Sequence, residues 1–65
     1  MKDYASIQTV LPLVGDESAK GRAVQLKNRI DDLNAHSEGG WELESTITVP
    51  AIDTLTIVDT LSRDK

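Results

Sequence analysis

This chain has no cysteine and no phenylalanine, and it carries only one tryptophan, one tyrosine and one histidine. Without cysteine, neither a disulfide framework nor a thiolate zinc site can form. The single histidine, His36, cannot form a histidine cluster around a metal ion. We therefore expect no metal site, and the sequence indicates no cofactor.

Long apolar segments are missing as well. No run approaches the roughly 18 apolar residues of a membrane-spanning helix. The opening Met-Lys-Asp-Tyr does not begin the charged-then-apolar pattern of a signal peptide. We therefore expect a cytoplasmic protein with no membrane partner. The formal net charge of -4 argues against general nucleic-acid binding, because Lys and Arg supply much of that affinity by neutralising phosphates.

The small size of the chain predicts self-association. We expect residues 1–65 to form a single small domain. Such a domain buries only roughly 60% of the surface that its unfolded chain exposes, so core burial barely offsets the loss of chain entropy. Small domains gain further stability from disulfides, metals or oligomerisation, and this composition leaves the third route. We therefore expect a homo-oligomer, with a symmetric dimer as the default.

Hydrophobic periodicity predicts the element order β-α-β-β and an α+β fold. Residues 4–11 alternate between apolar and polar positions, as a strand does, and Pro12 ends the run because it lacks an amide donor. Residues 41–49 alternate in the same way, whereas residues 54–62 carry apolar side chains on both faces, which favours a central strand. The predicted elements are strand 4–11, helix 20–36, strand 41–49 and strand 54–62.

The predicted helix has one apolar stripe, with residues at spacings of three and four, and this stripe should pack on the sheet. A polar loop side chain can cap its first turn, and a glycine of positive φ can close its last turn. The surface pairs should be Lys27 with Asp31 and Arg29 with Asp32. The stripe is Ala23, Leu26, Ile30 and Leu33; the cap candidates are Asp16 and Ser18, and the closing candidates are Gly39 and Gly40.

The sheet should have the spatial strand order 1-3-2. The short loop between the last two strands predicts an antiparallel hairpin. A right-handed crossover that skips one position then places strand 54–62 between the other two. The helix covers one face, and the opposite face, or an exposed edge, is available for pairing with another subunit. The exposed face should carry Val10, Thr46, Thr48, Thr56, Val58 and Thr60.

Asp59 needs a specific environment, because it shares its strand face with an apolar set of residues. It cannot be fully buried there without a partner. We expect it near a sheet end or paired with a residue such as Arg63. The tail of residues 63–65 should be frayed. The apolar set is Leu55, Ile57 and Leu61.

Trp41 stands at the junction between the predicted helix and the strand that follows it. A single tryptophan at such a junction is more often a packing anchor than a platform for a ligand. We therefore expect Trp41 to cover the end of the core near Leu33.

The helix has a charge order opposite to the one that its dipole favours, with basic residues in its N-terminal half and acidic residues toward its C-terminus. Exposed charges vary at little cost, which explains the order without a function. Alternatively, the basic end meets an anion, either a ligand phosphate or carboxylates of a neighbouring subunit. The candidate ligand-binding residues are Lys20, Arg22 and Arg29, with Trp41 or Tyr4 to stack a base.

The sequence offers little support for an enzyme. The segment from Gly15 to Arg22 lacks the Gly-Lys-Ser/Thr ending of a phosphate-binding loop. A lone histidine such as His36 near a helix end is usually a surface residue. Glu42 and Glu44 lie roughly 7 Å apart on one strand face, where a solvated surface explains them better than a weak cation site. We therefore expect no catalytic residue and no metal ligand.

The segment Gly40-Trp41-Glu42-Leu43, preceded by a helix and followed by a hairpin, resembles the short bacterial and phage proteins of the domain of unknown function 4177 family. Tyr4, the helix and strand 54–61 fall in matching places, so the resemblance covers most of the chain in outline. The chain departs from the family in having one aromatic residue in its first strand and no strongly basic tail. The resemblance implies the same fold and transfers no catalytic residue.

Two functions follow as expectations. The first is a non-enzymatic, homo-oligomeric protein-interaction module. The second is an oligomer that binds or sequesters a small anionic ligand, such as a nucleotide, at subunit junctions; it is an analogy with small phage proteins of that kind.

Overall fold

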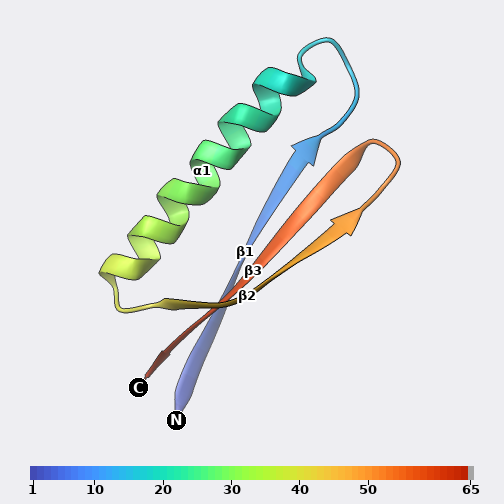
Figure 1. The fold of residues 1–65 in the computed structure, drawn as a ribbon. Coiled ribbons are helices and arrows are strands. Elements are labelled where there is room, and N and C mark those ends of the chain that lie inside the picture. Colours follow the sequence, from blue (N-terminus) through green and yellow to red (C-terminus); the bar gives the residue numbers. More distant parts are fainter. Residues whose placement is uncertain (65) are drawn as a thin grey trace.

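The computed structural model of the protein describes residues 1–64 and has one helix packed on a three-stranded antiparallel sheet (Figure 1). The sheet order is β1-β3-β2, and both outer strands run antiparallel to β3. The predicted α+β fold and strand order are therefore confirmed. The elements are β1 (Lys2–Pro12), α1 (Ser18–Glu38), β2 (Glu42–Pro50) and β3 (Thr54–Asp64).

The start of β3 is as predicted, and the other ends of the elements differ from the predicted ends by one or two residues. Strand β1 begins at Lys2 and β3 continues to Asp64, because these two residues pair with each other across the sheet. Arg63 therefore belongs to a paired strand rather than to a frayed tail, and Lys65 lies outside the described residues. Trp41 precedes β2 instead of opening it.

The helix starts without the predicted side-chain cap. Its N-cap residue is Glu17, and neither Asp16 nor Ser18 caps the first turn. A tight turn at Gly15, with φ of 106°, brings the Gly15 carbonyl to the amide of Ser18 instead. At the other end the prediction is confirmed, since Gly40 has φ of 87° and the Trp41 amide donates back to the His36 carbonyl.

The helix presents a different stripe to the sheet from the predicted one. No helix residue is buried, and Leu26 and Ile30 remain 42% and 50% exposed. The helix packs mainly on β1 and is rotated so that Arg29 points at the sheet. This rotation leaves the predicted apolar stripe partly exposed to solvent. The better covered helix residues are Ser18, Gly21, Arg22, Gln25, Arg29, Leu33 and His36.

Strand β2 contains a β-bulge that the alternating pattern did not reveal. The pairing of β2 with β3 shifts register between Leu43 and Ser45, so Glu44 is an extra residue. Because one extra residue reverses the side-chain direction, Thr46 now lies beside Asp59 on the helix side. The predicted exposed face is therefore wrong for β2: Thr46 and Thr48 leave it, and Ser45, Ile47 and Val49 replace them.

The hydrophobic core is small and the molecule is thin. Among residues 1–64 the buried hydrophobic side chains are those of Ile7, Leu11, Ile57 and Leu61. The Cα radius of gyration is 13.4 Å and the extents are 45 × 20 × 10 Å, whereas a compact chain of this length has a radius of roughly 11 Å. No helix in the described part of the chain is both long and apolar enough to cross a membrane.

Candidate functional site

The sheet face opposite the helix, called the back face below, carries an apolar half close to the β2–β3 hairpin. Strand pairing places two cross-strand rows there, which are defined by β3 residues Thr56 and Val58. Of the apolar side chains on the outer strands of this face, Val10 is 48% exposed and Ile47 is 58% exposed. The rows are Val10–Thr56–Val49 and Gln8–Val58–Ile47.

The other half of the back face is polar and carries charges that are paired within the chain. Ser62 donates a hydrogen bond to Glu44, and Lys2 Nζ lies 3.5 Å from the same carboxylate oxygen. The hydroxyl of Ser62 and then the charge of Lys2 lower the pKa of Glu44. The bulge positions Glu44 for both contacts. Glu44 is therefore engaged with Ser62 and Lys2 within the chain.

A buried ion pair joins the helix to the centre of the sheet. Arg29 donates two hydrogen bonds to Asp59, from Nε at 2.8 Å and from Nη2 at 2.9 Å. The side chain of Asp59 is fully buried, and Thr46 Oγ1 also donates to it at 2.7 Å. These bonds, that of Arg29 above all, hold the pKa of Asp59 below its usual value despite burial.

The predicted partner of Asp59 was wrong. The guanidinium carbon of Arg63 lies 4.5 Å from the centre of the Trp41 ring, and its Nη2 lies 3.9 Å from Asp3. Sequence reasoning required a cation for Asp59 but chose the nearest one along the chain. Arg29, for which the sequence predicts a surface pair with Asp32, instead faces the sheet and binds Asp59.

The other predicted surface pair of the helix is confirmed. Lys27 Nζ lies 3.2 Å from a carboxylate oxygen of Asp31, one helical turn further on. Both side chains are largely exposed, so this pair contributes little to stability.

Trp41 packs at the end of the helix, in the region expected from the sequence. Its ring meets the ring of His36 edge-on, with centroids 6.2 Å apart. It also lines a shallow depression together with Leu33 and Leu43. With Arg63 over its face, Trp41 has ring partners within the chain, and these contacts describe a packing anchor.

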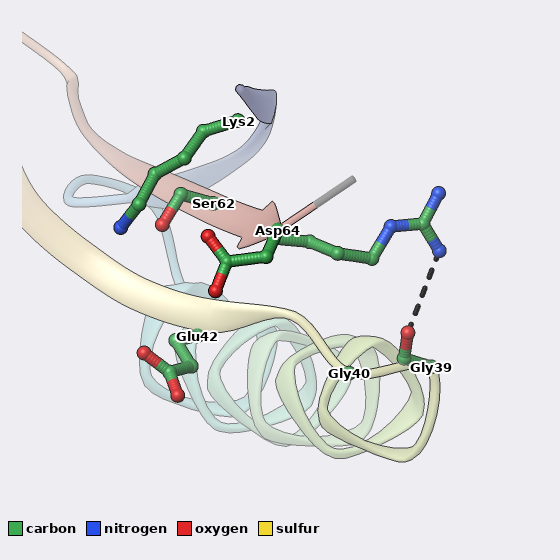
Figure 2. A pocket seen from close by; sticks show the side chains of 7 residues that line it. Lys2, Gly39, Gly40, Glu42, Ser62 and Asp64 are labelled. Carbon is green, nitrogen blue, oxygen red and sulfur yellow. Dashed lines mark hydrogen bonds between the residues drawn. The ribbon is translucent and has the colours of Figure 1, made fainter.

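A polar pocket of about 290 Å³ lies beside this cluster, at the end of the sheet away from the β2–β3 hairpin (Figure 2). Its lining combines two cations, Lys2 and Arg63, with two carboxylates, Glu42 and Asp64. Arg63 reaches the carbonyl of Gly39 at 3.4 Å (Figure 2). Because the charges balance and both cations already have partners, this pocket offers no concentrated positive charge to an anionic ligand.

The structure does not bring the five candidate ligand-binding residues together. Arg29 is held by Asp59 inside the two-layer fold, and Arg22 donates to the Pro12 carbonyl at 3.1 Å. Lys20 lies beside Val24 on the outer part of the helix. Trp41 lies past the opposite end of the helix, and Tyr4 projects from the back face. No contact among the described residues favours a shared anion site.

Other ligand chemistry has equally little support in the described residues. No group of three or more His, Asp and Glu side chains within residues 1–64 lies close enough together to hold a metal ion. His36 has its Nδ1 atom 2.7 Å from the backbone carbonyl of Asp32, a local helix contact. The apolar half of the back face is therefore the strongest candidate for a functional surface.

Comparison with known proteins adds no family. None of the protein-family models, curated proteins and solved structures compared with the chain matches it. The resemblance to the domain of unknown function 4177 family therefore stays a prediction.

Proposed function

We propose that this chain is a non-enzymatic, cytoplasmic interaction module that acts as a homo-oligomer. The unsatisfied apolar surface of the single chain supports this proposal. Among residues 1–64, four hydrophobic side chains are buried, while twelve large ones are at least 41% exposed. A fold with so little core needs a further layer, since hydrophobic burial is its main source of stability.

The shape of the molecule supports the same proposal. The accessible surface is 4592 Å² for a chain of 7.1 kDa, whereas a compact monomer of that mass exposes roughly 4,100 Å². The excess reflects one helix laid on one sheet, with none of residues 1–64 forming a layer behind the sheet. A second copy is the partner that is always present when the chain is made, so it can supply that layer permanently.

Surface chemistry favours protein contact over a small ligand. The polar pocket has balanced charges, and the cationic candidates are dispersed or already paired. The back face, in contrast, spans three strands, or roughly 14 Å in width from the spacing of strands. A sheet surface of this width suits a protein partner, whereas small molecules favour concave pockets.

Sedimentation equilibrium tests the proposal. At micromolar concentrations, the mass should correspond to two or more copies of the 7.1 kDa chain. Dilution should lower both the mass and the urea midpoint of unfolding together, because oligomerisation stabilises the folded state by mass action. A folded, strictly monomeric chain at these concentrations would contradict the proposal.

A further inference from the structure

The distribution of apolar and charged side chains on the back face defines how two copies can pack together. We propose that two copies stack back to back through the apolar halves of their sheets, with their β3 strands antiparallel and the two-fold axis passing near Thr56 and Val58. This inference rests on the proposed self-association and specifies its surface and orientation. The occupant of the back face is thus a second copy of the same chain.

The apolar half suits sheet-on-sheet packing. Val58 occupies the middle of the central strand, with Ile47 beside it on β2, and Val49 and Val10 flank Thr56 in the next row. Sheets pack about 10 Å apart when such side chains interdigitate. Threonine methyl groups can join this layer while their hydroxyls bond across the surface. A contact of this kind covers the four apolar side chains of both copies at once.

The central position of β3 fixes where a two-fold axis can lie. Apolar residues occur on both sides of β3, at Val10 on β1 and at Val49 on β2. A symmetric contact that covers both outer strands must therefore be centred on β3, because the same patch has to meet itself. The rows of Thr56 and Val58 hold the apolar side chains of this half, which places the centre between them.

Charge selects between the two possible orientations. The end of the back face away from the hairpin carries the carboxylates of Glu42, Glu44 and Asp64 and one lysine, Lys2. Parallel β3 strands would bring these acidic ends of both copies together, and the like charges would repel. Antiparallel β3 strands centred on the apolar half place the two acidic ends on opposite sides of the dimer, where water solvates them.

The same charges argue against other occupants of the face. The acidic end would repel an anionic lipid surface. Lys2 is already paired with Glu44, so the face has no unpaired cation among its described residues to recruit an acidic partner. The second exposed apolar strip lies on the helix and contains Leu26 and Ile30. This helix strip is the competing surface, and a substitution at Ile30 tests it.

Aspartate substitutions at exposed positions test the surface. Ile47→Asp should weaken self-association at least about 100-fold, since each contact would bury two unpaired carboxylates. Ile47 is 58% exposed in the single chain, so the fold of the protomer should survive, which circular dichroism checks. Val24→Asp is the matched control, because Val24 is 51% exposed on the helix and outside the stack; it should leave the association unchanged.

Spin labels test the orientation, and the absence of native cysteine allows one label per chain. Ile52→Cys places a label in the exposed hairpin loop. With antiparallel β3 strands centred between Thr56 and Val58, the two labels should lie about 30 Å apart, given about 3.3 Å per strand residue. With parallel strands, the loops would lie side by side and the distance would be about 10–20 Å.

Failure of this inference can be told from failure of the proposed function. A dimer that persists in Ile47→Asp but dissociates in Ile30→Asp would overturn the back-face contact and keep the oligomer. A short distance between the labels in a stable dimer would overturn the antiparallel orientation. A monomeric wild-type chain would remove both the inference and the proposed function. Loss of association in Ile47→Asp together with the long distance supports the inference.

Discussion

Replacement of Arg29 by alanine should lower the free energy of unfolding by about 3–5 kcal/mol, because it leaves a buried carboxylate without its cation. Asp59 is fully buried and Arg29 is 19% exposed in its side chain. A loss of this size approaches the whole stability of a domain this small. Urea unfolding at a fixed protein concentration measures it, since the proposed self-association would also contribute to the midpoint.

Two further variants separate the buried pair from a general loss of positive charge. Arg22→Ala removes an arginine of the same helix that makes one hydrogen bond to a backbone carbonyl, so it should cost about 1 kcal/mol. In Arg29→Ala/Asp59→Ala both charges are gone, and part of the stability should return. If Arg29→Ala cost no more than Arg22→Ala, the ion pair would not hold the helix on the sheet.

The ion pair of Arg29 and Asp59 should also make the free energy of unfolding depend on pH in the acidic range. Arg29 lowers the pKa of Asp59 in the folded state below its ordinary value of 3.8. As the pH falls, the Asp59 carboxylate is therefore protonated in the unfolded state before it is protonated in the folded state. The stabilisation is therefore fully present above that value and is lost as the pH drops through the lower pKa of the folded state. Urea unfolding over a series of pH values measures this loss, and Asp59→Asn should remove this part of the acid dependence.

Leu61→Ala should lower the free energy of unfolding by about 2–5 kcal/mol, whereas Leu26→Ala should cost clearly less. Leu61 is 2% exposed on the central strand, and Leu26 is 42% exposed on the helix. Truncation of the buried Leu61 side chain leaves a cavity and loses buried apolar area, whereas truncation of the exposed Leu26 side chain does so much less. The sequence placed both leucines in the core, so the comparison by urea unfolding distinguishes the structure from the pattern. Equal costs would show that the helix packs on its predicted stripe.

The order and type of the elements could be predicted because they depend on local periodicity. Residues 4–11 and 54–62 have the period of strands, and the helix has spacings of three and four. The strand order followed from a short hairpin loop and a crossover rule. These signals depend on residues that are close together in the sequence, so they could be recognised without knowledge of the tertiary packing.

The faces of β2 could not be predicted, because one extra residue changes them all. The alternation from Trp41 to Val49 is unbroken in the sequence, and nothing in it marks Glu44 as a bulge. The bulge allows two contacts that β2 makes with residues far away along the chain. Leu43 pairs with Leu61 on the helix side, and Thr46 must also reach that side to donate to Asp59.

The rotation of the helix has a similar long-range cause. Its apolar stripe predicts that Leu26 and Ile30 face the sheet, but Arg29 lies between them in sequence and must point at Asp59. The sequence did show that Asp59 needed a partner if it was buried. It could not show which of the basic residues would supply it, because that choice depends on the placement of the helix.

The central claim is that another copy covers the apolar half of the back face. The most direct measurement is an isotope-filtered NOE experiment on a mixture of labelled and unlabelled chains, which detects only contacts between copies. Cross-peaks between copies should involve the methyl groups of Ile47, Val49 and Val58. Their absence, or cross-peaks confined to Leu26 and Ile30 on the helix, would contradict the account.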